Sequence, residues 1–317
     1  MAETKYENSP TFKRMLLWAN ERFPLSHALL FFIMFFCAFV YGKVIMSEGP
    51  IALKFEDFFG FFATWAFFLL LRIFDEHKDY EIDCKNYPNR VLQSGLITLN
   101  NLKVLGALAI LCQVLVSTHF DQGIYFVTKI WLVTFLYSVL MAKEFFIGKW
   151  LEKRLVLYAF SHLLIMPFAL LWMAQMASPK MLMSTEIWPL LLLAFLSGAA
   201  FEITRKTKGP SEEKTGVDSY SKILGAKLSS FVIFLLLLSS LAVQIYVVES
   251  LFKAESLIPV LVLNSVFITA CFGLYSYIKS PSIKGRKINE ALVSLSMLVA
   301  YVVLTAVAIL DRGVLWL

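Results

Sequence analysis

Nine stretches of the chain are almost continuously apolar, and short polar intervals separate them. They cover residues 26–46, 55–74, 96–116, 124–142, 155–174, 187–204, 228–248, 256–278 and 289–310. A helix needs about 20 apolar residues to cross a bilayer, and each stretch has roughly that length. Because the runs are continuous rather than alternating, they favour helices over the strands of a membrane barrel. The pattern predicts an all-α, polytopic membrane protein, a bundle of nine transmembrane helices around a central cavity.

The composition agrees with a chain that lies mostly within lipid. Of its 317 residues, 59% are hydrophobic and only 16% are charged. A soluble domain needs a polar surface that this composition does not supply. Since the polar intervals are short throughout, we expect one transmembrane domain over residues 1–317.

The net charge is +6, and the basic residues are distributed along the chain as membrane orientation signals are, rather than as in a nucleic-acid-binding surface. The basic residues lie between the apolar runs, and a cytoplasmic N-terminus places all but six of the 29 Lys and Arg residues on the cytoplasmic side. By the positive-inside rule we predict a cytoplasmic N-terminus and an external C-terminus. We therefore expect an integral, multi-pass protein of a bacterial inner membrane, with its active site facing the cytoplasm and no nucleic-acid partner.

The first of two highly charged cytoplasmic loops, near residues 75–95, carries four acidic side chains at helical spacing. Asp75, Asp79 and Asp83 are spaced i, i+4, i+8, and Glu76 precedes Asp79 by three residues. A helix that continues out of the second span stacks these carboxylates on one face. Stacked like charges become favourable around a divalent cation, and oxygen ligands of this kind suit magnesium together with phosphate oxygens. A solvated helix end is the alternative, but ionisable groups at membrane depth are usually functional.

The residues of this loop resemble the UbiA superfamily of intramembrane prenyltransferases. That family carries N-D-x-x-D-x-x-x-D after its second helix, followed by N-R-P-L-x-x-G; this chain has "DEHKDYEID" and then "NRVLQSG". Asp75 stands at the family's Asn and Glu76 at its first Asp, so both changes keep oxygen ligands. Val91 replaces the proline of the second stretch. The resemblance implies transfer of a polyprenyl group from its diphosphate to an acceptor.

The second charged loop, near residues 202–227, matches the family's second acidic motif only in part. Gly216, Leu224 and Gly225 match its closing segment, whereas the family's upstream acids fall on Arg205 and Lys208. Glu202, Glu212, Glu213 and Asp218 remain as alternative ligands for a second metal. Arg205 and Lys206 are the other alternative, because they can neutralise diphosphate directly.

The expected site residues come from both loops. As Mg²⁺ ligands we expect Glu76, Asp79, Asp83, Glu212 and Glu213. As catalytic groups we expect Asp79, Asp83, Arg90, Arg205 and Lys206. As substrate-binding groups we expect Arg72, Asp75, Lys78, Asn89, Arg90, Glu202, Arg205, Lys206 and Tyr220.

The sequence thus predicts magnesium-dependent prenyl transfer from an allylic polyprenyl diphosphate to a small aromatic acceptor, with release of diphosphate. Two alternatives stay open. One is a phosphoribosyl-type transfer onto a polyprenyl phosphate, as in some members of the superfamily. The other is a transporter, which predicts ionisable groups at the bilayer midplane. The acceptor, the isoprenoid length, the presence of a second metal and the oligomeric state do not follow from the sequence.

Overall fold

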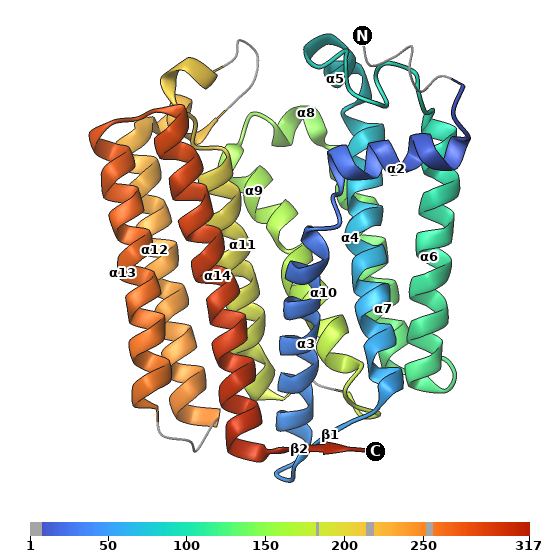
Figure 1. Ribbon diagram of the computed structural model, residues 1–317, viewed down its shortest axis with the longest axis vertical. Coiled ribbons are helices and arrows are strands. Elements are labelled where there is room, and N and C mark those ends of the chain that lie inside the picture. Colours follow the sequence, from blue (N-terminus) through green and yellow to red (C-terminus); the bar gives the residue numbers. More distant parts are fainter. Residues whose placement is uncertain (1–7, 182–183, 214–218, 252–255) are drawn as a thin grey trace. The chain divides into compact units, whose positions relative to one another are not determined.

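The computed structural model describes residues 8–181, 184–213, 219–251 and 256–317, and this part of the chain is almost entirely helical (Figure 1). Among these residues, eight helical segments are long and apolar enough to cross a membrane. They correspond to α3 (His27–Met46), α4 (Phe59–Lys78) with the preceding turn η1 (Phe55–Phe58), α6 (Leu99–Asp121), α9 (Leu155–Leu163) with α10 (Ile165–Gln175), α11 (Trp188–Arg205), α12 (Tyr220–Leu251), α13 (Leu257–Lys279) and α14 (Ile283–Arg312). The prediction of an all-helical, multi-pass membrane protein is therefore confirmed.

The remaining apolar helix, α7 (Phe126–Ala142), is shorter, at 17 residues. At about 1.5 Å per residue it is about 25 Å long, less than the hydrocarbon core of a typical bilayer. The nine predicted ranges all coincide with helices, but the ninth crossing and the orientation of the termini stay predictions.

Short elements connect the long helices. They are α2 (Thr11–Arg22), α5 (Tyr80–Asn86), η2 (Glu144–Phe146), α8 (Gly148–Leu151), η3 (Thr185–Ile187), η4 (Pro210–Glu212) and two strands, β1 (Ile51–Leu53) and β2 (Val314–Trp316). The strands pair in parallel, with Ile51 opposite Val314. This pairing does not follow from the sequence, because a strand of three residues has no detectable apolar period.

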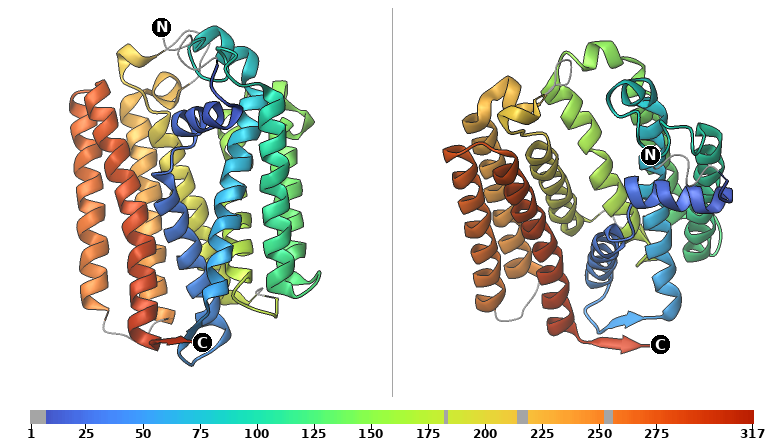
Figure 2. Two further views of the ribbon diagram at one scale, coloured as in Figure 1. Left: turned by 45° about the vertical axis from the view of Figure 1, so that its right-hand side comes forward. Right: turned by 45° about the horizontal axis from the view of Figure 1, so that its top comes forward.

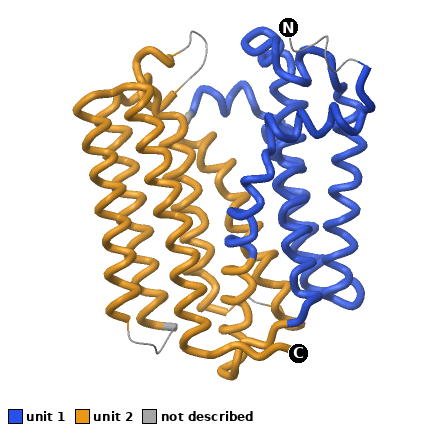
Figure 3. Tube along the Cα trace, viewed as in Figure 1, with its two compact units in different colours: residues 1–35, 54–155 blue, residues 36–53, 156–317 orange. Residues whose placement is uncertain are grey.

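The chain divides into two compact units (Figure 3). The first comprises Met1–Phe35 and Lys54–Leu155, and the second comprises Phe36–Leu53 and Val156–Leu317. Helix α3 begins in the first unit and ends in the second.

In the first unit, α4, α6 and α7 pack against one another, and α2 lies across α4 and α6 (Figure 1). Trp18 of α2 is fully buried in a cluster with Ile73 of α4 and Leu102 of α6. Leu92 and Ile97, from the segment between α5 and α6, complete the cluster. The burial of this indole explains why α2 packs onto the end of α4, where the acidic residues lie.

In the second unit, α11, α12, α13 and α14 lie side by side as a bundle, and α10 packs on α11 (Figure 2). The crossing formed by α9 and α10 is interrupted at Leu164. Pro167 accounts for the interruption, because proline cannot donate to the carbonyl four residues earlier and its ring crowds that carbonyl.

Candidate functional site

The acidic residues of the first loop lie on nearly continuous helical turns. Helix α4 ends at Lys78, and α5 begins at Tyr80, so that Asp79 stands at the junction. The Asp79 amide donates to the Asp75 carbonyl at 2.9 Å, and the Asp83 amide donates to the Asp79 carbonyl at 2.8 Å. These bonds keep the four-residue repeat across the junction, so Asp75, Asp79 and Asp83 follow one another on successive turns.

Asp79 has the clearest electrostatic signature among these carboxyl groups. Burial raises its pKa, and the negative charges of Asp75, Asp83 and Glu76 raise it further, while Lys78 opposes them. A cation beside Asp79 would relieve this repulsion. The donor chemistry of the stacked carboxylates therefore fits a hard divalent ion such as magnesium.

Glu76 is the most deeply buried of the four, with 1% of its surface exposed. Its Oε1 accepts hydrogen bonds from Arg22 Nε at 2.6 Å and from Arg72 Nη2 at 2.6 Å. Its Oε2 is buried and has no hydrogen-bond partner among the described residues. One oxygen of Glu76 is thus neutralised by two guanidinium groups, and the other is available for a further ligand.

Asp83 is also paired with arginine. Its Oδ2 lies 2.7 Å from Arg90 Nη1 and 3.7 Å from Arg22 Nη2. The Arg90 guanidinium in turn lies over the Tyr87 ring, 3.7 Å from the ring centroid. This stacking fixes the plane of the guanidinium, so Arg90 both orients Asp83 and brings positive charge to the loop.

The position at which the chain departs from the family's N-R-P-L stretch has a specific contact. The Val91 amide donates to Glu21 Oε2 of α2 at 2.9 Å. A proline at this position has no N–H group and cannot make the bond. The turn then closes at Gly95, whose φ of +84° belongs to the left-handed region that favours glycine.

The other predicted residues of the first loop are dispersed. Lys78 Nζ lies 3.8 Å from Glu144 Oε1, and Arg72 contacts Glu76. Asp75 is half-buried, whereas Asn89 is exposed. Within the described ranges, no group of three or more His, Cys, Asp and Glu side chains is arranged as a metal site. Magnesium commonly takes only one or two carboxylates together with substrate phosphate oxygens, so the donors present fit such an ion.

In the second loop, the predicted diphosphate-binding cations share one carboxylate. Glu202 Oε2 lies 2.7 Å from Arg205 Nη2, and Glu202 Oε1 lies 2.8 Å from Lys206 Nζ. Lys206 Nζ also lies 5.7 Å from the centre of the Tyr158 ring. Arg205 and Lys206 follow Glu202 by three and four residues, which places the three side chains on one helical face. The Arg205 side chain is half exposed and so remains accessible to an anion.

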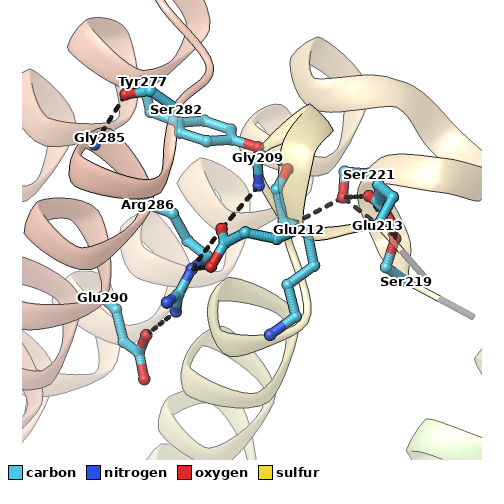
Figure 4. Close-up of polar contacts among 11 residues, drawn as sticks. Gly209, Glu212, Glu213, Ser219, Ser221, Tyr277, Ser282, Gly285, Arg286 and Glu290 are labelled. Atoms are coloured by element: carbon cyan, nitrogen blue, oxygen red, sulfur yellow. Dashed lines mark hydrogen bonds and ion pairs between the residues drawn. The ribbon is translucent and has the colours of Figure 1, made fainter. Parts of the chain in front are cut away.

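Glu212 is held by a residue that the sequence analysis did not identify. Arg286 of α14 donates through Nε to both Glu212 oxygens, at 3.1 and 2.9 Å, and also pairs with Glu290 (Figure 4). The Gly209 amide donates to Glu212 Oε2 at 3.1 Å. Burial alone would raise the pKa of Glu212, but the Gly209 and Arg286 hydrogen bonds outweigh it and lower that pKa.

Further contacts hold the described residues on either side of 214–218. Ser219 and Ser221 donate their hydroxyl hydrogens to Glu213, and the Lys208 amide donates to Ser221 Oγ at 2.7 Å. The Tyr277 hydroxyl of α13 donates to the Lys208 carbonyl at 2.6 Å. Lys208 and Glu212 are therefore tied to α13 and α14.

The end of the second loop contains Tyr220, predicted to bind substrate, and Asp218, predicted as an alternative metal ligand. Tyr220 is buried at the start of α12, and its amide donates to the Lys206 carbonyl at 3.0 Å. Asp218 and Gly216 lie outside the described residues. Gly225, which matches the family's closing Leu-Gly, has a φ of +76° within α12, a conformation that favours glycine.

The fold and the two charged loops define a class, that of polytopic helical membrane proteins with an acidic motif at the end of a transmembrane helix. The chain belongs to the UbiA prenyltransferase family, whose model matches residues 42–284. The predicted resemblance is thus confirmed, and members of this family are prenyltransferases. No curated protein sequence matches the chain.

Two solved structures are similar in fold. One concerns a digeranylgeranylglyceryl phosphate synthase, with 18% identity and a TM-score of 0.63; the match covers 94% of this chain and 99% of that one. The other is a UbiA homologue from Aeropyrum pernix K1, with 15% identity and a TM-score of 0.64; the match covers 88% of this chain and 97% of that one. At these identities the similarity shows the fold alone.

Proposed function

We propose that the chain is a magnesium-dependent prenyltransferase, which transfers a polyprenyl group from an allylic diphosphate to a small aromatic acceptor and releases diphosphate. The family membership supports the reaction class. The observation that carries the proposal is the stack of Asp75, Asp79 and Asp83 on successive turns, in which burial and neighbouring negative charge raise the pKa of Asp79.

In this proposal Glu76, Asp79 and Asp83 hold the magnesium ion. When bound, magnesium supplies Lewis-acid stabilisation of the negative charge on the leaving diphosphate. Glu76 offers its unpartnered Oε2, and Arg90 keeps Asp83 oriented through their 2.7 Å contact. Asp75, Arg72 and Lys78 of the same helix and the exposed Asn89 are the further substrate-binding residues of this proposal.

The second loop contributes positive charge in the same proposal. Arg205 and Lys206 bind the diphosphate, and Glu202 sets their positions by accepting from both. The Tyr220 hydroxyl is a further hydrogen-bonding group for the substrate. A second-metal role for Glu212 and Glu213 stays a prediction, and each of these carboxylates accepts hydrogen bonds from the protein itself.

We also propose nine crossings, a cytoplasmic N-terminus and an external C-terminus, in a bacterial inner membrane with the motif loops on the cytoplasmic side. The distribution of Lys and Arg supports this orientation. Both compact units form a single catalytic domain in this proposal, since the family match extends over parts of both.

The identity of the donor substrate distinguishes prenyl transfer from phosphoribosyl transfer. Purified protein in detergent is incubated with magnesium and either a radiolabelled allylic polyprenyl diphosphate or a radiolabelled phosphoribosyl diphosphate with polyprenyl phosphate. The proposal expects label from the allylic donor in a prenylated aromatic product. Turnover of the sugar donor alone would overturn it.

A further inference from the structure

A cavity in the first unit lies on the side of α4 away from the acidic stack. It has a volume of about 400 Å³ and is lined by α4, α6 and the end of α7. The α4 residues that line it are Leu70, Ile73, Phe74, His77 and Lys78. Their spacing of i, i+3, i+4, i+7 and i+8 defines one helical face. Asp75 and Asp79 fall on the other face, so the cavity and the proposed magnesium site use different faces of α4, and only Lys78 borders both.

The cavity has one charged end and one apolar end. Lys78 at the end of α4, Lys103 near the start of α6 and Lys143 just after α7 bring three ammonium groups to the same end of these three packed helices. Leu70 and Ile110 line the cavity deeper along α4 and α6. A molecule that fills the cavity therefore needs an anionic head and an apolar body.

The charges at the mouth are only partly compensated. Lys78 pairs with Glu144 at 3.8 Å. By contrast, no acidic side chain in the described part of the chain forms an ion pair with Lys103 or Lys143, and both lysines are exposed. Two cations at the mouth of an apolar cavity form a complementary surface for a phosphate group.

His77 provides a second, independent indication of a ligand. Its Nδ1 lies 2.8 Å from the Ile73 carbonyl, so Nδ1 carries the hydrogen of that bond. Its Nε2 is buried and has no hydrogen-bond partner among the described residues. A buried ring nitrogen without a partner is uncommon, and a hydroxyl or phosphate oxygen of a bound headgroup would satisfy it.

We propose that this cavity binds an acidic phospholipid, with its phosphate at Lys103 and Lys143 and part of an acyl chain against Leu70, Phe74 and Ile110. The cavity lies at the ends of the candidate membrane spans α4 and α6, the depth at which phospholipid headgroups lie. Lys and Arg side chains at helix ends often reach the interface without a specific ligand. Here, however, the lysines line a cavity of about 400 Å³. A water molecule in the liquid occupies only about 30 Å³, so the cavity has room for part of a lipid.

The test is native mass spectrometry of the full-length protein in detergent, titrated with phosphatidylglycerol or phosphatidylcholine. The double variant Lys103→Gln with Lys143→Gln should bind phosphatidylglycerol about tenfold more weakly, since each lysine near an anionic headgroup contributes several-fold in affinity. The matched control is Lys85→Gln with Lys153→Gln, which removes the same charge from exposed positions outside the cavity and should bind as the wild type does.

Two further experiments complete the test. One asks whether the lipid occupies the cavity, and the other distinguishes a lipid phosphate from free inorganic phosphate. Ala107 lines the cavity, and Ala107→Phe should reduce phosphatidylglycerol binding without changing the net charge. Millimolar inorganic phosphate should leave lipid binding unchanged. Equal lipid binding by the cavity and control variants, or displacement of the lipid by inorganic phosphate, would overturn the proposal. None of these readouts depends on prenyl transfer, so the outcome is independent of the proposed enzymatic function.

Discussion

Arg22 Nε donates to Glu76 Oε1 at 2.6 Å, which joins α2 to the acidic end of α4. The Glu76 side chain is fully buried, and Arg72 donates to the same oxygen from one turn earlier on α4. Glu76 stands where the family motif has its first aspartate, so the longer side chain here reaches two arginines. The N-terminal helix is therefore part of the structure that fixes the first loop.

Loss of Arg22 should destabilise the first unit. Arg22→Gln leaves the buried Glu76 carboxylate with one guanidinium instead of two, and we expect a loss of about 1–3 kcal/mol in the free energy of unfolding. Thermal unfolding in detergent measures this loss. Arg14→Gln is the matched control, because Arg14 of the same helix donates to the Leu96 carbonyl and not to a buried carboxylate. In a cycle with Glu76→Gln, strictly additive effects would contradict the pairing.

The Val91 amide gives a second prediction. Val91→Pro restores the family's proline but removes the N–H group that donates to Glu21 Oε2. We expect it to cost about 1 kcal/mol more than Val91→Ala, which keeps the amide. The measurement is the difference between the unfolding midpoints of the two variants. Glu21→Gln alters the acceptor of the same hydrogen bond, and so shows whether the difference arises from that bond. If the proline variant were as stable as the alanine variant, the hydrogen bond would make no net contribution to the free energy of unfolding.

The contact between Glu212 and Arg286 predicts a pH dependence of stability. The pKa of Glu212 lies below its ordinary value of 4.5, so the folded state binds this proton more weakly than the unfolded state. The stabilisation is therefore present above the ordinary value and is lost as the pH falls through the lowered pKa. Unfolding midpoints between neutral pH and about pH 3 should fall less steeply in Arg286→Gln than in the wild type. Equal slopes would show that Arg286 does not lower this pKa.

The sequence predicted the helices and the acidic stack, because both depend on local spacing. Nine apolar runs coincide with helices, and the four-residue repeat of Asp75, Asp79 and Asp83 survives the junction between α4 and α5. The contact of Glu202 with Arg205 and Lys206 was predictable for the same reason.

The partners of Glu76 and Glu212 were not predictable in this way. Arg22 and Arg286 lie 54 and 74 residues from the carboxylates that they bind. No periodic pattern connects such positions, since tertiary packing of α2 and α14 brings them together. In the sequence both arginines look like ordinary orientation signals at helix ends. The short α2 was also missed, because its single buried Trp18 does not produce a long apolar run.

The central claim is that the acidic stack binds magnesium and the donor's diphosphate, and release of diphosphate from an allylic polyprenyl diphosphate by purified protein tests it most directly. We predict magnesium-dependent turnover that EDTA abolishes and that Asp79→Asn lowers by about 100-fold or more, as expected for loss of electrostatic stabilisation of the leaving group. Glu81→Gln, an exposed acid on α5, should retain wild-type turnover. Turnover that is indifferent to magnesium and equal in the Asp79 and Glu81 variants would contradict the account.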